Sequence, residues 1–226
     1  MQSLASSFRI ISLFEDLPDR ELSAIVAACS VRSYDRDALI LDEQDQTSDL
    51  FFILAGAVRI SSVTATGREV IYTDIQAGSM FGEFSAMDLR PRSAAAVALS
   101  DCRLARMPAA VFRATLRANS GIAVRLSELL VAKMRSMSER VFEISALAVR
   151  ERVRRELLRL AAQGSTSDRH VIIKPAPTHY EIASRIGSHR EAVTREFNRL
   201  QDEKVIEVRR REICILDIAR LSVPPS

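Results

Sequence analysis

One long segment with the periodicity of a helix most constrains how this chain can fold. Residues 122–149 contain neither glycine nor proline. Apolar residues recur along the segment in steps of four and three, at Leu130, Met134, Met137, Val141, Ile144 and Ala148. This spacing is the heptad pattern of a helix that packs along a partner helix. We therefore expect a homodimer joined along this helix; the alternative is a helix that packs only against its own domain.

The chain before this helix is predicted to be rich in short β-strands. Glycine-containing turns such as Ala55-Gly56 and Thr66-Gly67 separate apolar runs of a few residues each. Many short strands with such spacing favour an antiparallel barrel or roll. The expected strands cover residues 38–41, 50–54, 58–63, 69–74, 94–99 and 102–106.

The chain after the long helix is predicted to mix helices with a hairpin. Residues 147–226 hold 16 Lys and Arg against 11 Asp and Glu, and this basic balance indicates binding to nucleic acid. Strands before the long helix and helices after it favour the α+β fold class. We expect three parts: residues 1–118, a helix and hinge at 119–148, and residues 149–226. The expected elements of the last part are a helix at 150–162, a loop after Gly164, a strand at 171–174, helices at 180–186 and 190–203, and a hairpin of 205–208 with 213–216.

Composition excludes several classes of protein. No apolar run reaches the roughly 18 residues of a membrane-spanning helix, and the N-terminus lacks the pattern of a secretory signal. Cys29, Cys102 and Cys214 lie far apart in the sequence, which argues against a disulfide framework and fits a reducing cytoplasm. The three histidines lack metal-ligand spacing, and the sequence shows no nucleophile–base arrangement. We expect neither a metal site nor an enzyme.

A first motif, at residues 81–95, has the chemistry needed to hold a sugar phosphate. Gly82 lets backbone N–H groups approach a ligand closely. An ionised Glu83 accepts hydrogen bonds from hydroxyl groups, and Arg92 matches a phosphate in a bidentate pair. Ser93 and the N–H of Ala94 supply further donors for phosphate oxygens. The alternative is that Glu83 and Arg92 form an ion pair that brackets a loop.

A second motif, at residues 178–200, predicts a helix-turn-helix. Thr178 and Glu181 have the spacing of a capping box, Gly187 suits a tight turn, and Ser188 precedes the second helix as a candidate cap. One face of that helix is apolar and the other polar, as in a recognition helix. The alternative is an ordinary solvated helical hairpin. The polar face carries Arg190, Glu191, Thr194 and Arg195.

The two motifs together resemble the CRP/FNR superfamily of transcription regulators. Phe81-Gly82-Glu83, followed nine residues after the glutamate by Arg92-Ser93-Ala94, is similar to the phosphate-binding cassette of cyclic-nucleotide-binding domains. The resemblance implies an N-terminal β-roll that binds the nucleotide, a central dimerisation helix and a C-terminal winged helix-turn-helix. It implies that Glu83 holds the ribose 2′-OH and Arg92 the cyclic phosphate. The implied ligand-binding residues are Gly82, Glu83, Phe84, Arg92, Ser93, Ala94, Met137 and Ser138.

This chain departs from the family pattern at the residues that contact the purine base of the nucleotide. In members that sense cAMP, a Thr-Ser pair on the central helix contacts the purine, and the matching pair here is Met137-Ser138. A methionine thioether is a poor partner for the exocyclic amine of adenine. The expected ligand is therefore cAMP or cGMP. The single Cys29 near the N-terminus does not fit an iron–sulfur cluster, and we expect no haem.

The resemblance also implies that Arg190, Glu191 and Arg195 read promoter DNA at TGTGA-like half-sites. Arg can span O6 and N7 of guanine, and Glu accepts from N4 of cytosine. RNA polymerase is the further partner implied, with no membrane association. The alternative is a family member that binds DNA without a cyclic nucleotide. Further DNA contacts are expected from Thr194 and Thr178. His189, Arg199 and the run Arg209-Arg210-Arg211 are expected to contact phosphates; the alternative is that they are only solvated surface.

Overall fold

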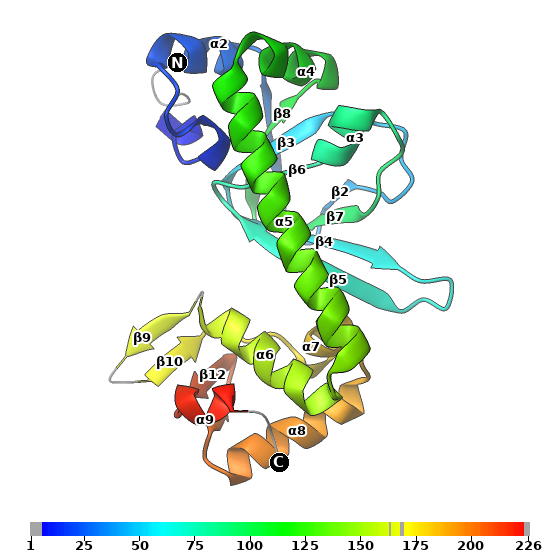
Figure 1. The fold of residues 1–226 in the computed structure, drawn as a ribbon, viewed down its shortest axis with the longest axis vertical. Helices are drawn as coiled ribbons and strands as arrows, with labels where there is room; N and C mark the ends of the chain where they lie inside the picture. Colours follow the sequence, from blue (N-terminus) through cyan, green and yellow to red (C-terminus); the bar gives the residue numbers. More distant parts are fainter. Residues whose placement is uncertain (1–5, 163, 168–169, 224–226) are drawn as a thin grey trace. The chain divides into compact units, whose positions relative to one another are not determined.

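The computed structural model describes residues 6–162, 164–167 and 170–223 (Figure 1). The chain divides into two compact units, Met1–Met134 and Arg135–Ser226, here called the N-terminal and C-terminal units. The long helix α5 (Ser120–Ala146) contributes residues to both. Within the described residues, no helix combines the length and apolar character needed to cross a membrane.

The N-terminal unit is an antiparallel roll covered by helices. Its described strands form one sheet in the order β1-β8-β3-β6 and a second in the order β2-β7-β4-β5. The strands are β1 (Ser30–Tyr34), β2 (Leu39–Leu41), β3 (Leu50–Ala55), β4 (Ala57–Val63), β5 (Glu69–Gln76), β6 (Met80–Phe81), β7 (Ala95–Ala98) and β8 (Cys102–Met107). The helical elements are η1 (Ser12–Phe14), α2 (Asp19–Ala27), α3 (Glu83–Asp88), α4 (Ala109–Ala118) and the start of α5.

Strand β3 explains where the core of this unit lies. Its residues from Leu50 to Leu54 are all buried, because β3 pairs with β8 on one side and β6 on the other and is covered on both faces. One face contacts an aromatic group in which Phe8 and Phe14 lie 5.9 and 5.0 Å from the Phe52 ring. Phe51 and Ile53, on the other face, belong to a core cluster that includes Val58 and Ala96 of the second sheet. The predicted roll is confirmed, and all six predicted strands are present within one to two residues.

Strands β1 and β6 and helix α3 were not predicted from the sequence. Strand β1, with the sequence SVRSY, is an exposed edge strand that pairs only with β8 among the described strands, so it shows no apolar alternation. Strand β6 has two residues, and α3 has six between left-handed residues Gly82 and Leu89. Elements this short are held by tertiary contacts rather than by local pattern.

The C-terminal unit is a winged helix-turn-helix, as predicted. Its described strands form a sheet in the order β11-β12-β10-β9 against the helices, around a core that includes Val153, Ile182 and Phe197. The elements are α6 (Val149–Ala161), β9 (Ser165–Ser167), β10 (His170–Ile173), α7 (His179–Ile186), α8 (Arg190–Asp202), β11 (Ile206–Arg209), β12 (Glu212–Ile215) and α9 (Ile218–Ser222).

Two local predictions for this part of the chain are corrected. The segment after Gly164, expected as a loop, contains strand β9, which pairs with β10. The helix expected over residues 122–149 ends at Ala146, and Ala148 is the extended N-cap of α6, so a break separates the two helices. Neither glycine nor proline marks this break in the sequence, which is why periodicity alone did not detect it.

Candidate functional site

The first motif runs from the end of β6 through α3 to the start of β7, and it folds around the side chain of Arg92. Gly82 is the N-cap of α3 and has a φ of +82°. A Cβ at this position would lie 2.7 Å from Nη1 of Arg92 and 3.0 Å from the carbonyl oxygen of Asp49. Both the left-handed conformation and this close approach favour glycine. Gly82 is therefore what allows the Arg92 guanidinium to lie directly beneath the loop.

Arg92 is buried, with only 2% of its surface exposed. Its Nε donates to Oγ1 of Thr47 at 3.0 Å, Nη2 to the Asp49 carbonyl at 2.8 Å, and Nη1 to the Gly82 carbonyl at 3.2 Å. Burial lowers the pKa of Arg92, and the nearby carboxylates of Asp49 and Asp45 oppose that effect. Because an arginine stays protonated in proteins, the loop contains a fixed positive charge.

Glu83 is the acidic counterpart at the first turn of α3. Its side chain is buried, and its Oε1 accepts a hydrogen bond of 2.7 Å from Nζ of Lys133 on α5. The alternative raised from the sequence, a Glu83–Arg92 ion pair, is therefore not the arrangement present. Lys133 was not among the predicted residues. It lies fifty positions from Glu83, and the heptad pattern of α5 gives no signal for it.

The remaining predicted ligand residues are exposed or half-buried. Phe84 and Ser93 are exposed, and Ala94 is half-buried at the start of the chain segment that leads into β7. Met137 and Ser138 are exposed on the part of α5 that belongs to the C-terminal unit. The structure thus brings Gly82, Glu83 and Arg92 together, and the binding roles of all eight residues remain predictions.

The second motif has the local geometry expected of a helix-turn-helix. Thr178 Oγ1 accepts a bond from the Glu181 amide at 3.2 Å, while the Glu181 carboxylate accepts one from the Thr178 amide at 2.8 Å, as predicted for the capping box. Gly187 is left-handed, with a φ of +63°, and ends α7. The N-cap of α8 is His189 rather than the predicted Ser188. The side chains of Arg190, Glu191 and Arg195 are exposed on α8, where they are accessible to a ligand.

Thr194 takes part in bonds between the two helices of the motif. Its hydroxyl donates to the Arg190 carbonyl at 3.0 Å and lies 2.9 Å from Nδ1 of His179 on α7. The His179 ring also packs 4.5 Å from the ring of Phe197. Burial, and secondarily the charge of Arg190, lower the pKa of His179. His179 was not predicted as a site residue, and here it joins α7 to α8.

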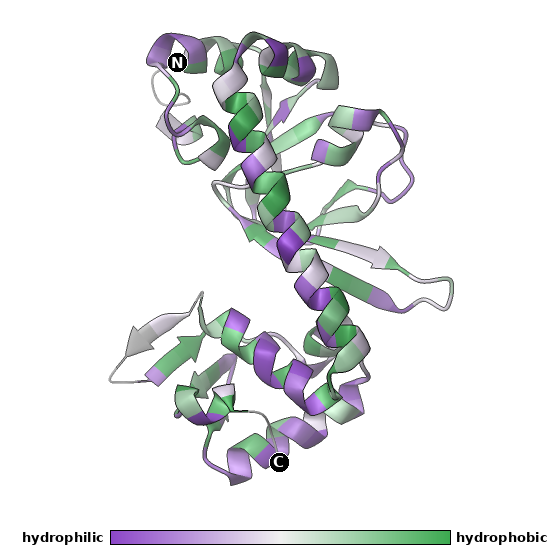
Figure 2. Cartoon of the chain, viewed as in Figure 1, coloured by the Kyte–Doolittle hydropathy of each residue, from purple (hydrophilic) through white to green (hydrophobic). Residues whose placement is uncertain are grey.

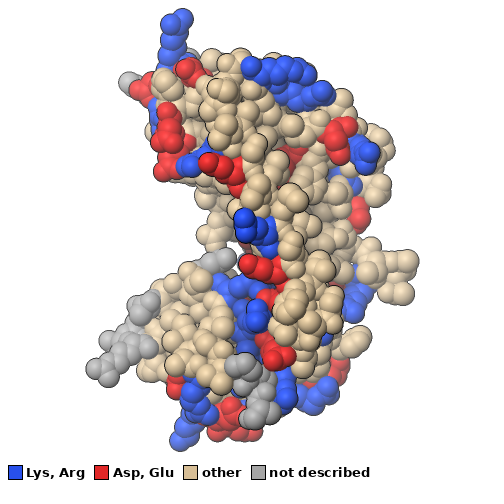
Figure 3. Space-filling model, in the orientation of Figure 1, with Lys and Arg blue, Asp and Glu red and all other residues tan. Residues whose placement is uncertain are grey.

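Arginine side chains line a cleft at the start of α6. A cavity of about 340 Å³ lies among residues that include Arg150, Arg195 and Arg199. The first amides of a helix point outward and attract anions. Arg199 is also held by Glu196, through two bonds of 3.0 Å each. Lys and Arg side chains, with Asp and Glu among them, lie on the visible face of this unit (Figure 3). The cleft thus joins basic side chains to a helix N-terminus.

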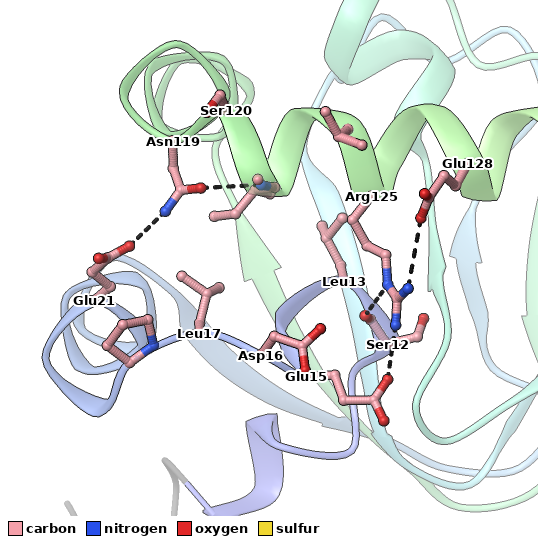
Figure 4. Close-up of a pocket in the computed structure, with 14 residues that line it drawn as sticks. Ser12, Leu13, Glu15, Asp16, Leu17, Glu21, Asn119, Ser120, Arg125 and Glu128 are labelled. Carbon is pink, nitrogen blue, oxygen red and sulfur yellow. Dashed lines mark hydrogen bonds and ion pairs between the residues drawn. The ribbon is translucent and has the colours of Figure 1, made fainter.

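A larger cavity, of about 510 Å³, lies at the start of α5 in the N-terminal unit (Figure 4). Arg125 donates to Glu15 at 2.9 Å and lies 3.6 Å from Glu128. Asn119 accepts a bond from the Ile122 amide and donates to Glu21. These bonds join the N-terminal segment to α5, and none of the predicted site residues lines this cavity. Within the described part of the chain, no group of His, Cys, Asp and Glu is arranged to hold a metal ion.

Comparisons with known proteins agree with the two motifs. Residues 31–119 match the family model of the cyclic nucleotide-binding domain, and residues 151–223 match that of the Crp-like helix-turn-helix domain. The first range contains Gly82, Glu83 and Arg92, and the second contains α7 and α8.

Relatives match over most of the chain. The cAMP-activated global transcriptional regulator Vfr of Pseudomonas aeruginosa is 28% identical over 200 residues, which is 87% of this chain and 94% of Vfr. The cAMP-activated global transcriptional regulator CRP of Haemophilus influenzae is 26% identical over 198 residues, 87% of this chain and 88% of that protein. The solved structure of the Thermus thermophilus catabolite activator protein, 27% identical, matches with a TM-score of 0.54 over 93% of this chain and 96% of that one. The first two relatives are named as regulators of transcription and the third as a catabolite activator protein. With its nucleotide-binding roll, long helix and winged helix-turn-helix, the chain belongs to the CRP/FNR superfamily of transcription regulators.

Proposed function

We propose that this protein is a homodimeric, cytoplasmic transcription regulator whose binding to palindromic, TGTGA-like promoter sites is controlled by cAMP or cGMP. The observation that carries the proposal is the buried Arg92 beneath the left-handed Gly82, next to a carboxylate at the first turn of α3. Relatives of the chain are named as cAMP-activated regulators, which supports the same ligand class. RNA polymerase is the further partner that we propose.

The cassette residues have complementary roles toward a cyclic nucleotide. Arg92 supplies a fixed positive charge for the single negative charge of the cyclic phosphate. Ser93 and the Ala94 amide follow Arg92 in the chain and donate to phosphate oxygens in this proposal. Glu83, ionised and partnered by Lys133, accepts the ribose 2′-OH. A 2′-OH is present in both cAMP and cGMP, so these groups do not distinguish the two bases.

Recognition of the base is assigned to α5. Ser138 donates or accepts one hydrogen bond, whereas Met137 offers only a weakly accepting thioether. With one hydrogen-bonding side chain instead of two, we expect the preference for adenine over guanine to be reduced. We propose cAMP as the first ligand and cGMP as a competitor of similar affinity.

The dimer is proposed from the exposed apolar face of α5. Met134, Met137, Val141 and Ile144 are 67%, 57%, 64% and 51% exposed, and α5 shows apolar residues recurring along its length (Figure 2). Such a row of large apolar side chains is costly to leave in water and matches the predicted heptad seam. A second copy of the same helix covers it by symmetry.

DNA binding is assigned to the exposed face of α8. Arg190, Glu191 and Arg195 are proposed to read base edges in the major groove, with half-sites about one helical turn, or about 34 Å, apart. Thr194, which lies between α7 and α8, is proposed as a further DNA contact. Phosphate contacts are proposed for Thr178, His189, Arg199 and the wing residues 209–211, with Arg150 at the cleft beside the start of α6.

Titration of nucleotide-free protein with cAMP and with cGMP, followed by DNA selection with and without each nucleotide, tests this function. We expect both nucleotides to bind and at least one to increase recovery of a TGTGA-like palindrome. Selection of the palindrome without any nucleotide effect would favour the alternative of a ligand-independent regulator. Absence of nucleotide binding together with absence of a selected sequence would refute the proposal.

A further inference from the structure

The last turns of α5 are tied to the turn of the helix-turn-helix by Arg140. One guanidinium nitrogen of Arg140 lies 3.4 Å from the carboxylate of Glu156 on α6, and another donates to the carbonyl oxygen of Arg185 on α7 at 3.2 Å. All of these residues belong to the C-terminal unit. Arg140 therefore contacts both the helix that follows α5 and the end of the first helix of the motif.

Arg140 acts on α7 where α7 needs a donor. The last four carbonyls of a helix have no partner within the helix, and this end of the helix carries partial negative charge. Arg152 on α6 donates to the carbonyls of Ile186 and Gly187, next to the one that Arg140 reaches. The left-handed turn at Gly187 is thus bounded by guanidinium groups from α5 and α6. The geometry of this turn sets the direction in which α8 leaves α7.

Buried carboxylates fix the position of these arginines. Glu156 is 1% exposed and faces Arg140, Arg159 and Arg185. Glu143, three residues after Arg140, accepts two bonds of 2.8 and 2.9 Å from Arg159. Burial alone would raise the pKa of Glu143, but the bonds and charges of the surrounding arginines hold it below its usual value. Buried ions are costly unless paired, so the network strongly favours one arrangement of α5 against α6 and α7.

We propose that Arg140 is the positioning residue through which the central helix controls the helix-turn-helix. Ser138, the proposed contact to the purine, lies two residues before Arg140 on the same helix. A shift of α5 at Ser138 moves Arg140, and Arg140 carries that shift to the α7 turn and hence to α8. This inference rests on the proposed function for its regulatory role, whereas the mechanical role of Arg140 stands without it.

Two variants separate this role from simple loss of an ion pair. Arg140→Met removes the bonds to Glu156 and to the Arg185 carbonyl. Arg155→Met is the matched control. Arg155 belongs to the same network, since its Nη1 lies 3.5 Å from Oε1 of Glu143, but its side chain is 52% exposed. Amide hydrogen exchange of the ligand-free full chain is the first measurement. The amide of Ser188, which donates to the Ala183 carbonyl at 2.9 Å, reports directly on the turn.

We expect Arg140→Met to increase exchange in residues 183–189 together with the last turns of α5, and Arg155→Met to leave the α7 turn protected. Equal protection of the turn in both variants would overturn the positioning role. If Arg140→Met does not fold, Arg140→Lys replaces it, since a lysine keeps the charge beside Glu156 but lacks the fork that reaches two acceptors. A turn as protected in Arg140→Lys as in the wild type would also overturn the role.

The second measurement is DNA affinity with and without the nucleotide that the wild type binds. Allosteric coupling typically corresponds to a change in affinity of about 5- to 150-fold. We expect Arg140→Met to reduce the wild-type ratio to about one, and Arg155→Met to preserve it. An unchanged ratio in Arg140→Met would overturn the regulatory part of the inference. A wild-type protein that does not respond to nucleotide would instead refute the proposed function, and the exchange data would still decide the mechanical role.

Discussion

Replacement of Arg92 by alanine is the most direct test of the nucleotide pocket. The variant removes a buried guanidinium that donates to Thr47, to the Asp49 carbonyl and to the Gly82 carbonyl. In the proposed complex it also removes the main positive charge facing the cyclic phosphate. Ligand affinity and the stability of the N-terminal unit should both change, but by different amounts.

The loss of affinity follows from the burial of Arg92. Truncating one partner of a buried, hydrogen-bonded charge pair costs about 2–5 kcal/mol of binding free energy. At about 1.4 kcal/mol for each factor of ten, nucleotide binding should weaken roughly 30- to 5,000-fold. The loss of stability should be smaller. The acceptors left behind are neutral, water can enter a polar cavity, and the cost of burying the guanidinium disappears. We expect a decrease of about 1–3 kcal/mol in the free energy of unfolding.

Arg106→Ala is the control for this experiment. Arg106 donates to the Asp49 side chain at 2.7 Å from the neighbouring strand β8, and it is partly exposed. Its loss should lower stability by at most about 1 kcal/mol and leave nucleotide affinity within a few-fold of the wild type. Isothermal titration calorimetry and chemical denaturation of both variants measure the two quantities. Nucleotide affinity of Arg92→Ala within threefold of the wild type, with the fold intact, would refute the assignment of Arg92 to the phosphate.

Three further changes test other parts of the site. Lys133→Met leaves the buried Glu83 without its partner and should weaken nucleotide binding about 5- to 30-fold by calorimetry, whereas Lys133→Arg should retain it; equal loss in both would contradict the pairing. The pKa of His179 is lowered in the folded state, so the unfolded chain takes up its proton first, and the free energy of unfolding should fall as pH decreases below about 6.5. In His179→Gln, the free energy of unfolding, measured by chemical denaturation between pH 7.5 and 5.5, should lose this pH-dependent component. A pH dependence equal to that of the wild type would exclude His179 as its source. Met137→Thr should shift the ratio of cAMP to cGMP affinity toward cAMP by about fivefold, as measured by competition binding, because it adds one hydrogen bond worth about 1 kcal/mol.

An element of the fold could be predicted where its own residues determine it. It could not be predicted where contacts with other elements determine it. Strand β4 and helices α7 and α8 have alternation, caps and a glycine turn in the sequence itself, and each lies within about two residues of its prediction. Strand β1 is polar, and it exists because β8 offers an edge for pairing. The break between α5 and α6 also depends on tertiary contacts, since Glu143 and Arg159 join the helices on either side of it.

The same distinction applies to the residues of the candidate site. Gly82, Glu83 and Arg92 could be found from spacing because one short loop places them together. Lys133 could not, because its partner lies on another element and its own helix follows a pattern set by the apolar seam. The same holds for Arg140 and Glu156, which are ordinary charged residues of helices until the fold half-buries the arginine and buries the glutamate. Spacing along the chain detects groups that one loop assembles, but not groups assembled by contacts between elements.

Thr194 shows how such contacts alter the meaning of a residue in a motif. From the sequence, a hydroxyl among Arg190, Glu191 and Arg195 is a candidate to contact a base. In the fold, its single proton is donated to the Arg190 carbonyl, and an oxygen lone pair faces His179. A hydroxyl engaged in this way has less to offer a base edge, but it fixes the separation of α7 and α8. Any effect of Thr194 on DNA preference should therefore depend on His179, and the two substitutions should be non-additive in a double-mutant cycle of DNA affinity. Additive effects would mean that Thr194 contacts DNA independently.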